Sequence, residues 1–183
     1  VTVSTCELRR TGSVGNESKV ADDGELITRA RDDPAAFVHL YRRHYDVVFR
    51  YCVHRLFERA TAEDVTSEVF LKVVENFRRF NGNEEQFRNW LYRIATNAVN
   101  HHLRKTARRD GLLRTTAERV DSSAANCGES SERLALLRDA MLALKPRYQT
   151  VITLRFFENL KLTEIAEVLG SSPGTVRSQL ARA

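Results

Sequence analysis

The sequence predicts an all-α fold made of two small helical domains joined by a flexible linker, the second of them a helix-turn-helix domain. The chain has 183 residues but only three prolines and eight glycines, so long stretches can run as uninterrupted helix. Within those stretches apolar residues recur at three- and four-residue steps, the period of an amphipathic helix. From about residue 109 to 131 this period gives way to Ser, Ala, Gly and Asn. We therefore expect a disordered N-terminal extension at 1–24, a first domain at 25–108, a linker at 109–131 and a second domain at 132–183.

Three helices are expected in the main part of the first domain. The Asp-Pro pair at 33–34 marks the start of a long helix, and a second helix begins at Thr61 or Ala62. The third begins near Asn83, because Asn83 and Gln86 have the spacing of a capping box, and it runs to about residue 109.

The end of the chain, 162–183, reads as two short helices joined by a tight turn. Gly170 supplies the stop of the first helix. Ser172 is a capping residue that stands before Pro173, and proline fits the first position of the second helix. Two helices this short cannot bury enough surface alone, so they need a third element behind them. We expect the apolar residues Leu134, Leu137, Met141 and Leu144 to begin a second core, which provides this third element.

Composition narrows the classes of function. A net charge of +5 and a pI near 9.4 are compatible with a nucleic-acid partner. The three cysteines are widely spaced and no Cys/His cluster has zinc spacing, which favours a reducing cytoplasm and predicts no metal site. No apolar run approaches the ~20 residues that span a bilayer, and 1–24 lacks the continuous apolar segment of a signal peptide.

The helix expected over 62–77 has two different faces. Its apolar stripe consists of Val65, Val69, Val73 and Phe77, with Phe70 and Val74 on the flank. The opposite face carries Asp64, Glu68, Glu75 and Arg78, and Leu71 lies among them. An isolated exposed leucine usually carries no information, so a solvated face is the ordinary interpretation. Leu71 among carboxylates also suits a surface that binds a basic, partly apolar partner.

The helix expected over 86–109 contains six basic residues and no carboxylate. Its buried stripe is predicted to be Phe87, Trp90, Leu91, Ile94 and Ala98. The other side presents Asn89, Tyr92, Arg93, Thr96, Asn100 and Arg104. Amides, a hydroxyl, an aromatic ring and arginines on one face are groups that bind phosphates, base edges and stacked bases. A helix that is only solvated would normally interleave glutamates.

Three segments in this order resemble the extracytoplasmic-function (ECF) group of bacterial RNA polymerase sigma factors. The stretch AEDVTSEVFLKV resembles that family's clamp-binding helix, and FRNWLYRIATNAVNHHLRK resembles the helix that opens and reads the minus-ten promoter element. The stretch from 142 to 183 resembles the domain that reads the minus-thirty-five element. A helix-turn-helix pattern alone is common. These three different segments, in this order and divided by a linker, make the resemblance to the family specific.

The resemblance implies three groups of binding residues. The core-polymerase contacts would be Asp64, Ser67, Glu68, Leu71 and Lys72. The minus-ten DNA contacts would be Asn83, Arg88, Asn89, Tyr92, Arg93, Thr96, Asn100 and Arg104. The minus-thirty-five DNA contacts would be Ser172, Thr175, Arg177, Ser178, Gln179 and Arg182.

The chain departs from the family pattern at several positions. Ser67 stands where the family usually has glutamine, Lys161 where a serine commonly caps a helix, and Gln179 where a basic residue is common. The loop at 80–87 is one residue longer than usual and holds two glutamates, which leaves open the residue that captures the flipped minus-ten base. The family's recognition helix ordinarily continues with more basic residues, so we expect the natural helix to run past Ala183.

The leading hypothesis is therefore a dissociable subunit that binds core RNA polymerase, through its clamp and flap, and promoter DNA, both duplex and single-stranded. The resemblance implies no catalysis and no cofactor, a cytoplasmic location on the nucleoid when active, and an anti-sigma partner that holds the protein near the membrane in many relatives. The alternative is a helix-turn-helix transcriptional regulator of the response-regulator output type. Such a protein would carry a parallel-sheet receiver upstream, and the first half of this chain has no alternating strand pattern. The sequence also lacks a Ser-His-Asp order, a glycine-rich phosphate loop and an HExxH motif.

Overall fold

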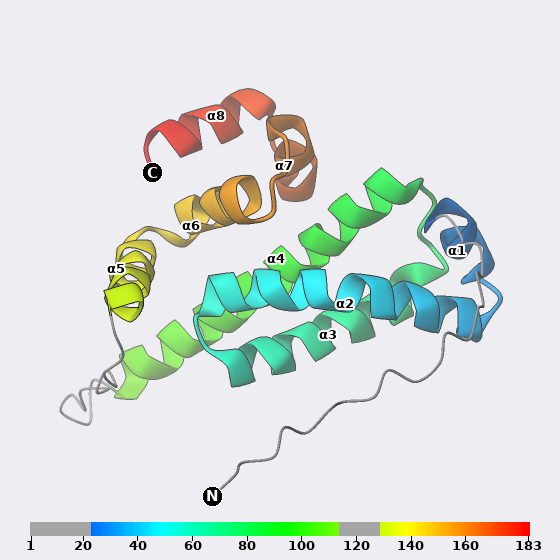
Figure 1. Cartoon of the computed structure of the whole chain (residues 1–183), viewed down its shortest axis with the longest axis horizontal. Coiled ribbons are helices and arrows are strands. Elements are labelled where there is room, and N and C mark those ends of the chain that lie inside the picture. The colour runs from blue at the N-terminus through cyan, green and yellow to red at the C-terminus, as the bar shows by residue number, and fades with distance from the viewer. Residues whose placement is uncertain (1–22, 114–128) are drawn as a thin grey trace, which may run out of the picture.

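The computed structural model describes residues 23–113 and 129–183, and every regular element in these two ranges is helical (Figure 1). The all-α prediction is confirmed. The N-terminal unit consists of α1 (Asp23–Arg29), α2 (Pro34–Leu56), α3 (Arg59–Phe77) and α4 (Glu84–Leu113). The C-terminal unit consists of α5 (Glu129–Ala143), α6 (Pro146–Ile152), the π-helical turn η1 (Thr153–Phe157), α7 (Leu162–Leu169) and α8 (Pro173–Ala181).

The local start and stop signals act as the sequence predicts. The Asp33 carboxylate accepts a hydrogen bond from the Ala35 amide at 2.8 Å, which caps α2. Asn83 and Gln86 exchange two hydrogen bonds of 2.9 Å, the capping box expected at the start of α4. The expected helix start at Thr61 or Ala62 is slightly late, because α3 begins at Arg59.

Two predicted segments lie wholly or mostly outside the described residues. These are the disordered extension, expected at 1–24, and the linker, expected at 109–131. At the edges of the expected linker, α4 continues to Leu113 and α5 already begins at Glu129.

The core of the N-terminal unit lies between α2, α3 and α4. The expected stripe on α3 is buried throughout, with Val69 at 0% exposed. Phe87 of α4 is the centre of an aromatic cluster, because its ring lies 5.3–5.9 Å from the rings of four neighbours: His44, Phe77, Phe80 and Trp90. On α4 the expected stripe is buried at Phe87, Leu91 and Ala98, whereas Trp90 and Ile94 are half-buried.

The C-terminal unit contains the helix-turn-helix. Gly170 adopts the left-handed conformation with φ 60°, which ends α7, and the Ser172 hydroxyl accepts from the Thr175 amide at 3.1 Å at the start of α8. Val176 is fully buried, so it anchors α8 to the rest of the unit. The core expected between Leu134 and Leu144 is mostly wrong, because only Met141 of the expected residues is buried, whereas Leu134 and Leu137 are exposed. Lys161 stands at the N-cap of α7, where the family commonly has a capping serine. Part of the lost capping is replaced, because the Lys161 amide donates to the Glu164 carboxylate at 2.6 Å.

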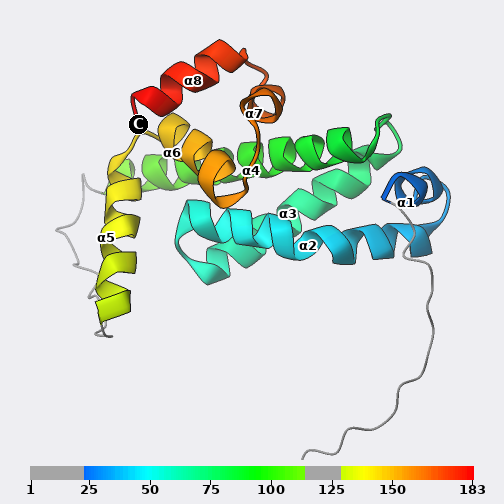
Figure 2. The ribbon, with the colours of Figure 1, turned by 45° about the horizontal axis from the view of Figure 1, so that its top comes forward.

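The two units pack against each other. In Figure 1 α6, α7 and α8 lie over α2 and α4, on the side of the N-terminal unit away from α3, and Figure 2 shows α7 directly beside α4. The contacts run mainly between α7 and α4 and between η1 and α2. This packing is the feature of the fold that the sequence did not predict.

Cys52 provides a test of the packing in the N-terminal unit. Burial raises the pKa of its thiol to about 11, and the side chain has no exposed surface. The variant Cys6→Ser/Cys127→Ser retains Cys52 as its only thiol. We expect Ellman's reagent at pH 8 to label the folded variant more than ~100-fold more slowly than the unfolded variant, because the thiolate is the reactive form. The folded state also binds the thiol proton more tightly. Stability should therefore fall as pH rises above the unfolded thiol pKa of ~8.5. Fast labelling of the folded protein would contradict the packing.

Candidate nucleic-acid interface

The face of α4 that was expected to be solvent-exposed is largely covered. Asn89, Tyr92 and Thr96 are buried, with exposed fractions of 4%, 4% and 3%. The prediction that this face is exposed is therefore wrong for this conformation. The C-terminal unit covers Asn89 and Tyr92, which bond to Glu167 of α7 and to Glu158. Thr96 is instead buried within the N-terminal unit, beside the Tyr51 hydroxyl of α2.

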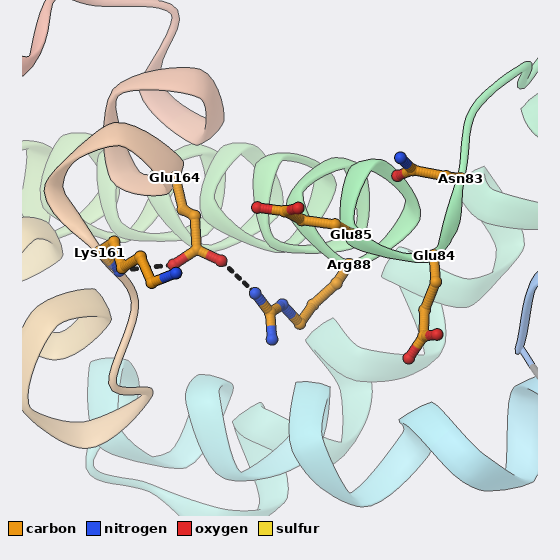
Figure 3. Close-up of a pocket in the computed structure, with 6 residues that line it drawn as sticks. All are labelled: Asn83, Glu84, Glu85, Arg88, Lys161 and Glu164. Atoms are coloured by element: carbon orange, nitrogen blue, oxygen red, sulfur yellow. Dashed lines mark hydrogen bonds and ion pairs between the residues drawn. The ribbon is translucent and has the colours of Figure 1, made fainter.

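Three glutamates of the C-terminal unit hold polar side chains of this face. Arg88 is bonded to Glu164, and Figure 3 shows the two side chains pointing toward each other across the junction. Asn89 donates from Nδ2 to Glu167 Oε2 at 2.8 Å. Tyr92 donates from its hydroxyl to Glu158 Oε2 at 2.8 Å. Burial, followed by the charge of Glu158, raises the pKa of Tyr92 well above its usual range, so this hydroxyl stays protonated as a donor.

Glu158 is the most enclosed of the three carboxylates. Its side chain has no exposed surface, although it lies within ion-pair distance of two cationic or titratable groups of α2. Arg50 Nη2 lies 3.7 Å from Oε2, and His54 Nδ1 lies 3.5 Å from Oε1. The residue follows the π-helical turn directly, and its amide closes that turn by donating to the Thr153 carbonyl at 3.1 Å. Such turns are frequent at functional sites.

A buried arginine forms the second connection between the units. Arg55 of α2 is 1% exposed and donates to Gln149 Oε1 of α6 at 2.9 Å. It also donates to Asn100 Oδ1 of α4 at 3.0 Å, so that Asn100 is engaged and half-buried. Thr96 is 2.8 Å from the Tyr51 hydroxyl within the N-terminal unit.

The remaining predicted minus-ten residues lie at the edges of the covered area. Arg88, Arg93 and Arg104 are exposed, apart from the bond that Arg88 makes to Glu164. Asn83 is exposed and its side chain is used in the capping box. It lines an open groove between the two units together with Glu84, Glu85, Arg88, Lys161 and Glu164 (Figure 3).

The predicted polymerase-binding face of α3 is open. Leu71 is 65% exposed and Val74, near it on the same side, is 55% exposed. Asp64 and Ser67 are exposed, whereas Glu68 and Lys72 are half-buried and form an ion pair of 2.5 Å four residues apart. An apolar side chain this exposed beside carboxylates is the arrangement that the sequence analysis described.

The predicted recognition helix is open on its outer side as well. Ser172, Thr175, Arg177, Ser178 and Arg182 are exposed, and Gln179 is half-buried. The Ser172 hydroxyl lies 2.9 Å from the Thr175 hydroxyl, so both belong to the helix cap as well as to the outer surface.

Several residues of the junction were missed by the sequence analysis: Arg50, Arg55, Gln149, Glu158, Glu164 and Glu167. One signal was available, because an acid-free helix with six basic residues at 86–109 is followed by a segment with three glutamates at 158–167. Complementary charge in two segments of one chain is a reason to test whether they pair.

Within the described ranges, no group of three or more His, Cys, Asp or Glu side chains is arranged to hold a metal ion. Nor does any helix in those ranges have the length and apolar character needed to cross a membrane.

Comparison with known proteins identifies the family. Residues 40–109 match the model of sigma-70 region 2, and residues 134–183 match the model of sigma-70 region 4. The chain is 34% identical over 174 residues to the RNA polymerase sigma-H factor of Pseudomonas aeruginosa and covers 89% of it. It is 33% identical over 173 residues to the ECF RNA polymerase sigma-E factor of Haemophilus influenzae and covers 90% of it. The chain therefore belongs to the sigma-70 family, in its ECF group.

Three further comparisons relate the chain to one longer relative and to two solved folds. It is 37% identical over 166 residues to the ECF RNA polymerase sigma factor BldN of Streptomyces coelicolor, and spans 62% of the length of that protein. Its fold is similar to that of CnrH in a complex with the cytosolic domain of CnrY, with a TM-score of 0.62 at 22% identity over 86% of this chain and 89% of that one. A TM-score of 0.63 at 19% identity, over 80% of this chain and 90% of that one, relates it to sigma factor RpoE of Bartonella quintana in a complex with the anti-sigma factor NepR.

Proposed function

We propose that this protein binds core RNA polymerase as a dissociable subunit and directs promoter recognition, promoter melting and the start of transcription, with no catalytic step of its own. It works in the cytoplasm, on the nucleoid when active. The observation that supports this most strongly is the order of three surfaces in one chain. These are an exposed apolar and acidic face on α3, a nucleic-acid-type face on α4 and an outward-facing recognition helix α8.

The contact with core polymerase uses α3. Leu71 is the apolar anchor, and Asp64, Ser67, Glu68 and Lys72 surround it with polar groups, the composition of a contact with an apolar centre and a polar rim. The second contact with core polymerase is made by α5, which binds the flap. On α5, Leu134, Leu136 and Leu142 are 52–69% exposed. Leucines so exposed along one short helix support a partner surface.

The contact with melted minus-ten DNA uses the face of α4 that carries the predicted minus-ten residues. Arg88, Arg93 and Arg104 neutralise phosphates, Asn89 and Asn100 offer amides to base edges, and Tyr92 offers a ring for stacking. Asn83 and Thr96 complete this group at the start and middle of the helix. Because the C-terminal unit covers the centre of this face, the two units must separate before the strand can bind.

The contact with the minus-thirty-five duplex uses α8 in the major groove. Thr175, Arg177 and Ser178 point outward near the helix start, where a recognition helix presents its base-reading residues, and Gln179 and Arg182 follow. Ser172 lies at the helix start, where its position suits a phosphate contact.

An anti-sigma protein is the proposed negative regulator. The solved relatives named above are bound by CnrY and by the anti-sigma factor NepR, respectively. We propose that a protein of this kind sequesters the chain, either in the cytoplasm or near the membrane, until a signal releases it.

The alternative, a helix-turn-helix regulator, predicts a different relation to the polymerase. A sigma factor occupies the sigma site on core polymerase, whereas a regulator acts on polymerase that already carries one. We expect this protein to compete with a purified housekeeping sigma factor for core polymerase in a fluorescence anisotropy titration. Binding to the sigma-loaded enzyme without competition would favour the regulator.

A further inference from the structure

We propose that the contact between the C-terminal unit and α4 is an autoinhibitory latch. In this state Glu158, Glu164 and Glu167 occupy the minus-ten face of α4 in the free protein, so that melted DNA and the C-terminal unit exclude each other. This inference rests on the proposed function of α4 in binding the melted strand.

The chemistry of the three contacts supports a direct competition. Arg88, Asn89 and Tyr92 present a guanidinium, an amide and a hydroxyl on one face of α4, and each binds one of the carboxylates. These donors are of the kinds that bind phosphate oxygens and base edges in nucleic-acid complexes. The glutamates accept the bonds that DNA would accept, and their negative charges repel phosphates.

Burial makes the competition mutually exclusive. Tyr92 and Asn89 are each 4% exposed, and the Glu158 side chain has no exposed surface at all. A base cannot stack on Tyr92 while Glu158 lies against it. The Tyr92 ring packs against Tyr51 of α2 on one side, and its hydroxyl is held by Glu158 of the C-terminal unit.

The junction is also built so that it can be released. Among the described residues, four buried polar atoms at this contact make no hydrogen bond: Glu158 Oε1 and His54 Nδ1, which lie 3.5 Å apart, Asn89 Oδ1 and Arg55 Nε. Each buried polar atom left without a partner weakens the closed state relative to a fully bonded interface. A partner that binds both units therefore needs only a modest difference in affinity to open the protein.

The closed state leaves the proposed polymerase surface available. Leu71 is exposed on α3, and α3 lies on the side of the N-terminal unit away from α7 and α8 (Figure 1). Core polymerase can therefore dock on α3 first, and the unlatching that exposes α4 follows in the complex. The latch would keep the free protein from binding melted DNA without preventing its capture by polymerase.

The test removes the three charges and keeps the shapes. The triple variant is Glu158→Gln/Glu164→Gln/Glu167→Gln. Glutamine at residue 164 can still accept the hydrogen bond that caps α7, because a capping box takes either glutamate or glutamine. Its control is Glu25→Gln/Glu63→Gln/Glu132→Gln, which changes the net charge equally at exposed positions away from the junction. The probe is a random-sequence pool of fluorescent single-stranded DNA 20-mers, and small-angle X-ray scattering reports the opening independently of any DNA.

We expect the triple variant to have a larger radius of gyration than its control and to bind the DNA pool at least about fivefold more tightly, because apparent affinity rises with the competent fraction. Glu167→Arg, compared with Glu63→Arg, should act in the same direction, and residue 167 is exposed enough to accept the change. If neither measurement differs from the controls in either pair, the latch is overturned. If the radius rises without tighter DNA binding, the covered face is not a DNA face and the proposal is equally overturned, while competition for core polymerase still decides the sigma function separately.

Discussion

Replacing Leu71 with aspartate is expected to weaken binding to core RNA polymerase by at least about thirtyfold. A central apolar anchor commonly contributes ~2 kcal/mol or more to an interface, and a buried unpaired charge adds a further penalty. Leu71 is 65% exposed in the free protein, so the change should leave the folded state intact. The measurement is an equilibrium titration of labelled protein with core polymerase.

The matched control is Val38→Asp on α2. Val38 is another exposed apolar residue, at 43%, and it lies outside the proposed docking face. The two variants should have similar thermal unfolding temperatures, and only the change at residue 71 should lower the affinity for polymerase. Unchanged affinity for Leu71→Asp would return the α3 face to an ordinary solvated surface. Adding Glu68→Ala to Leu71→Asp should weaken the binding of core polymerase further if the whole face docks.

Replacing Tyr92 with alanine is expected to reduce open-complex formation on duplex promoters by about 5- to 150-fold, from the ~1–3 kcal/mol that stacking contributes per base. The loss should be much smaller on templates already melted at the minus-ten element, because those no longer need the strand to be captured as it opens. The measurement is permanganate reactivity of unpaired thymines with reconstituted polymerase.

Tyr92→Phe separates stacking from the latch. The phenylalanine ring can still stack, but it lacks the hydroxyl that donates to Glu158. We expect this variant to melt promoters at least as well as the unaltered protein. Equal losses on duplex and melted templates for Tyr92→Ala would instead indicate a packing defect. Thermal unfolding detects such a defect, since the Tyr92 ring contacts Tyr51 with centroids 5.6 Å apart.

Local features of the fold could be predicted because their physical causes are local. The Asp33 cap, the Asn83–Gln86 capping box and the Gly170 stop each depend on residues within a few positions. The α3 stripe depends only on helical period and apolarity. These signals predicted α2, α3, α4 and the helix-turn-helix correctly, to within three residues at the helix starts that they specified.

The covered face of α4 could not be predicted in the same way. Its bonds join residues far apart in sequence, such as Asn89 and Glu167, which are 78 positions apart. A polar and basic helix face has the same pattern whether it binds DNA, water or another part of the chain. Only the structure shows that glutamates of the C-terminal unit bind it here.

The conformation changes how the binding residues are interpreted, but it does not test their roles. Asn89, Tyr92 and Thr96 are buried against other parts of the protein, while Arg93, Arg104 and the outer side of α8 are exposed. Their DNA contacts stay predictions. The relation between the two proposals is simple: a sigma factor requires that the α4 face be exposed at the promoter, and the latch accounts for its being covered before then.

The most direct test of the sigma function is transcription in vitro with purified core polymerase that contains no other sigma factor, over a library of genomic promoter fragments. We predict discrete start sites on a subset of fragments only when this protein is added, with a shared sequence element about ten and another about thirty-five positions upstream of each start. The account would be contradicted if core polymerase, shown active with another sigma factor, gave no specific transcripts with this protein at any concentration that saturates binding.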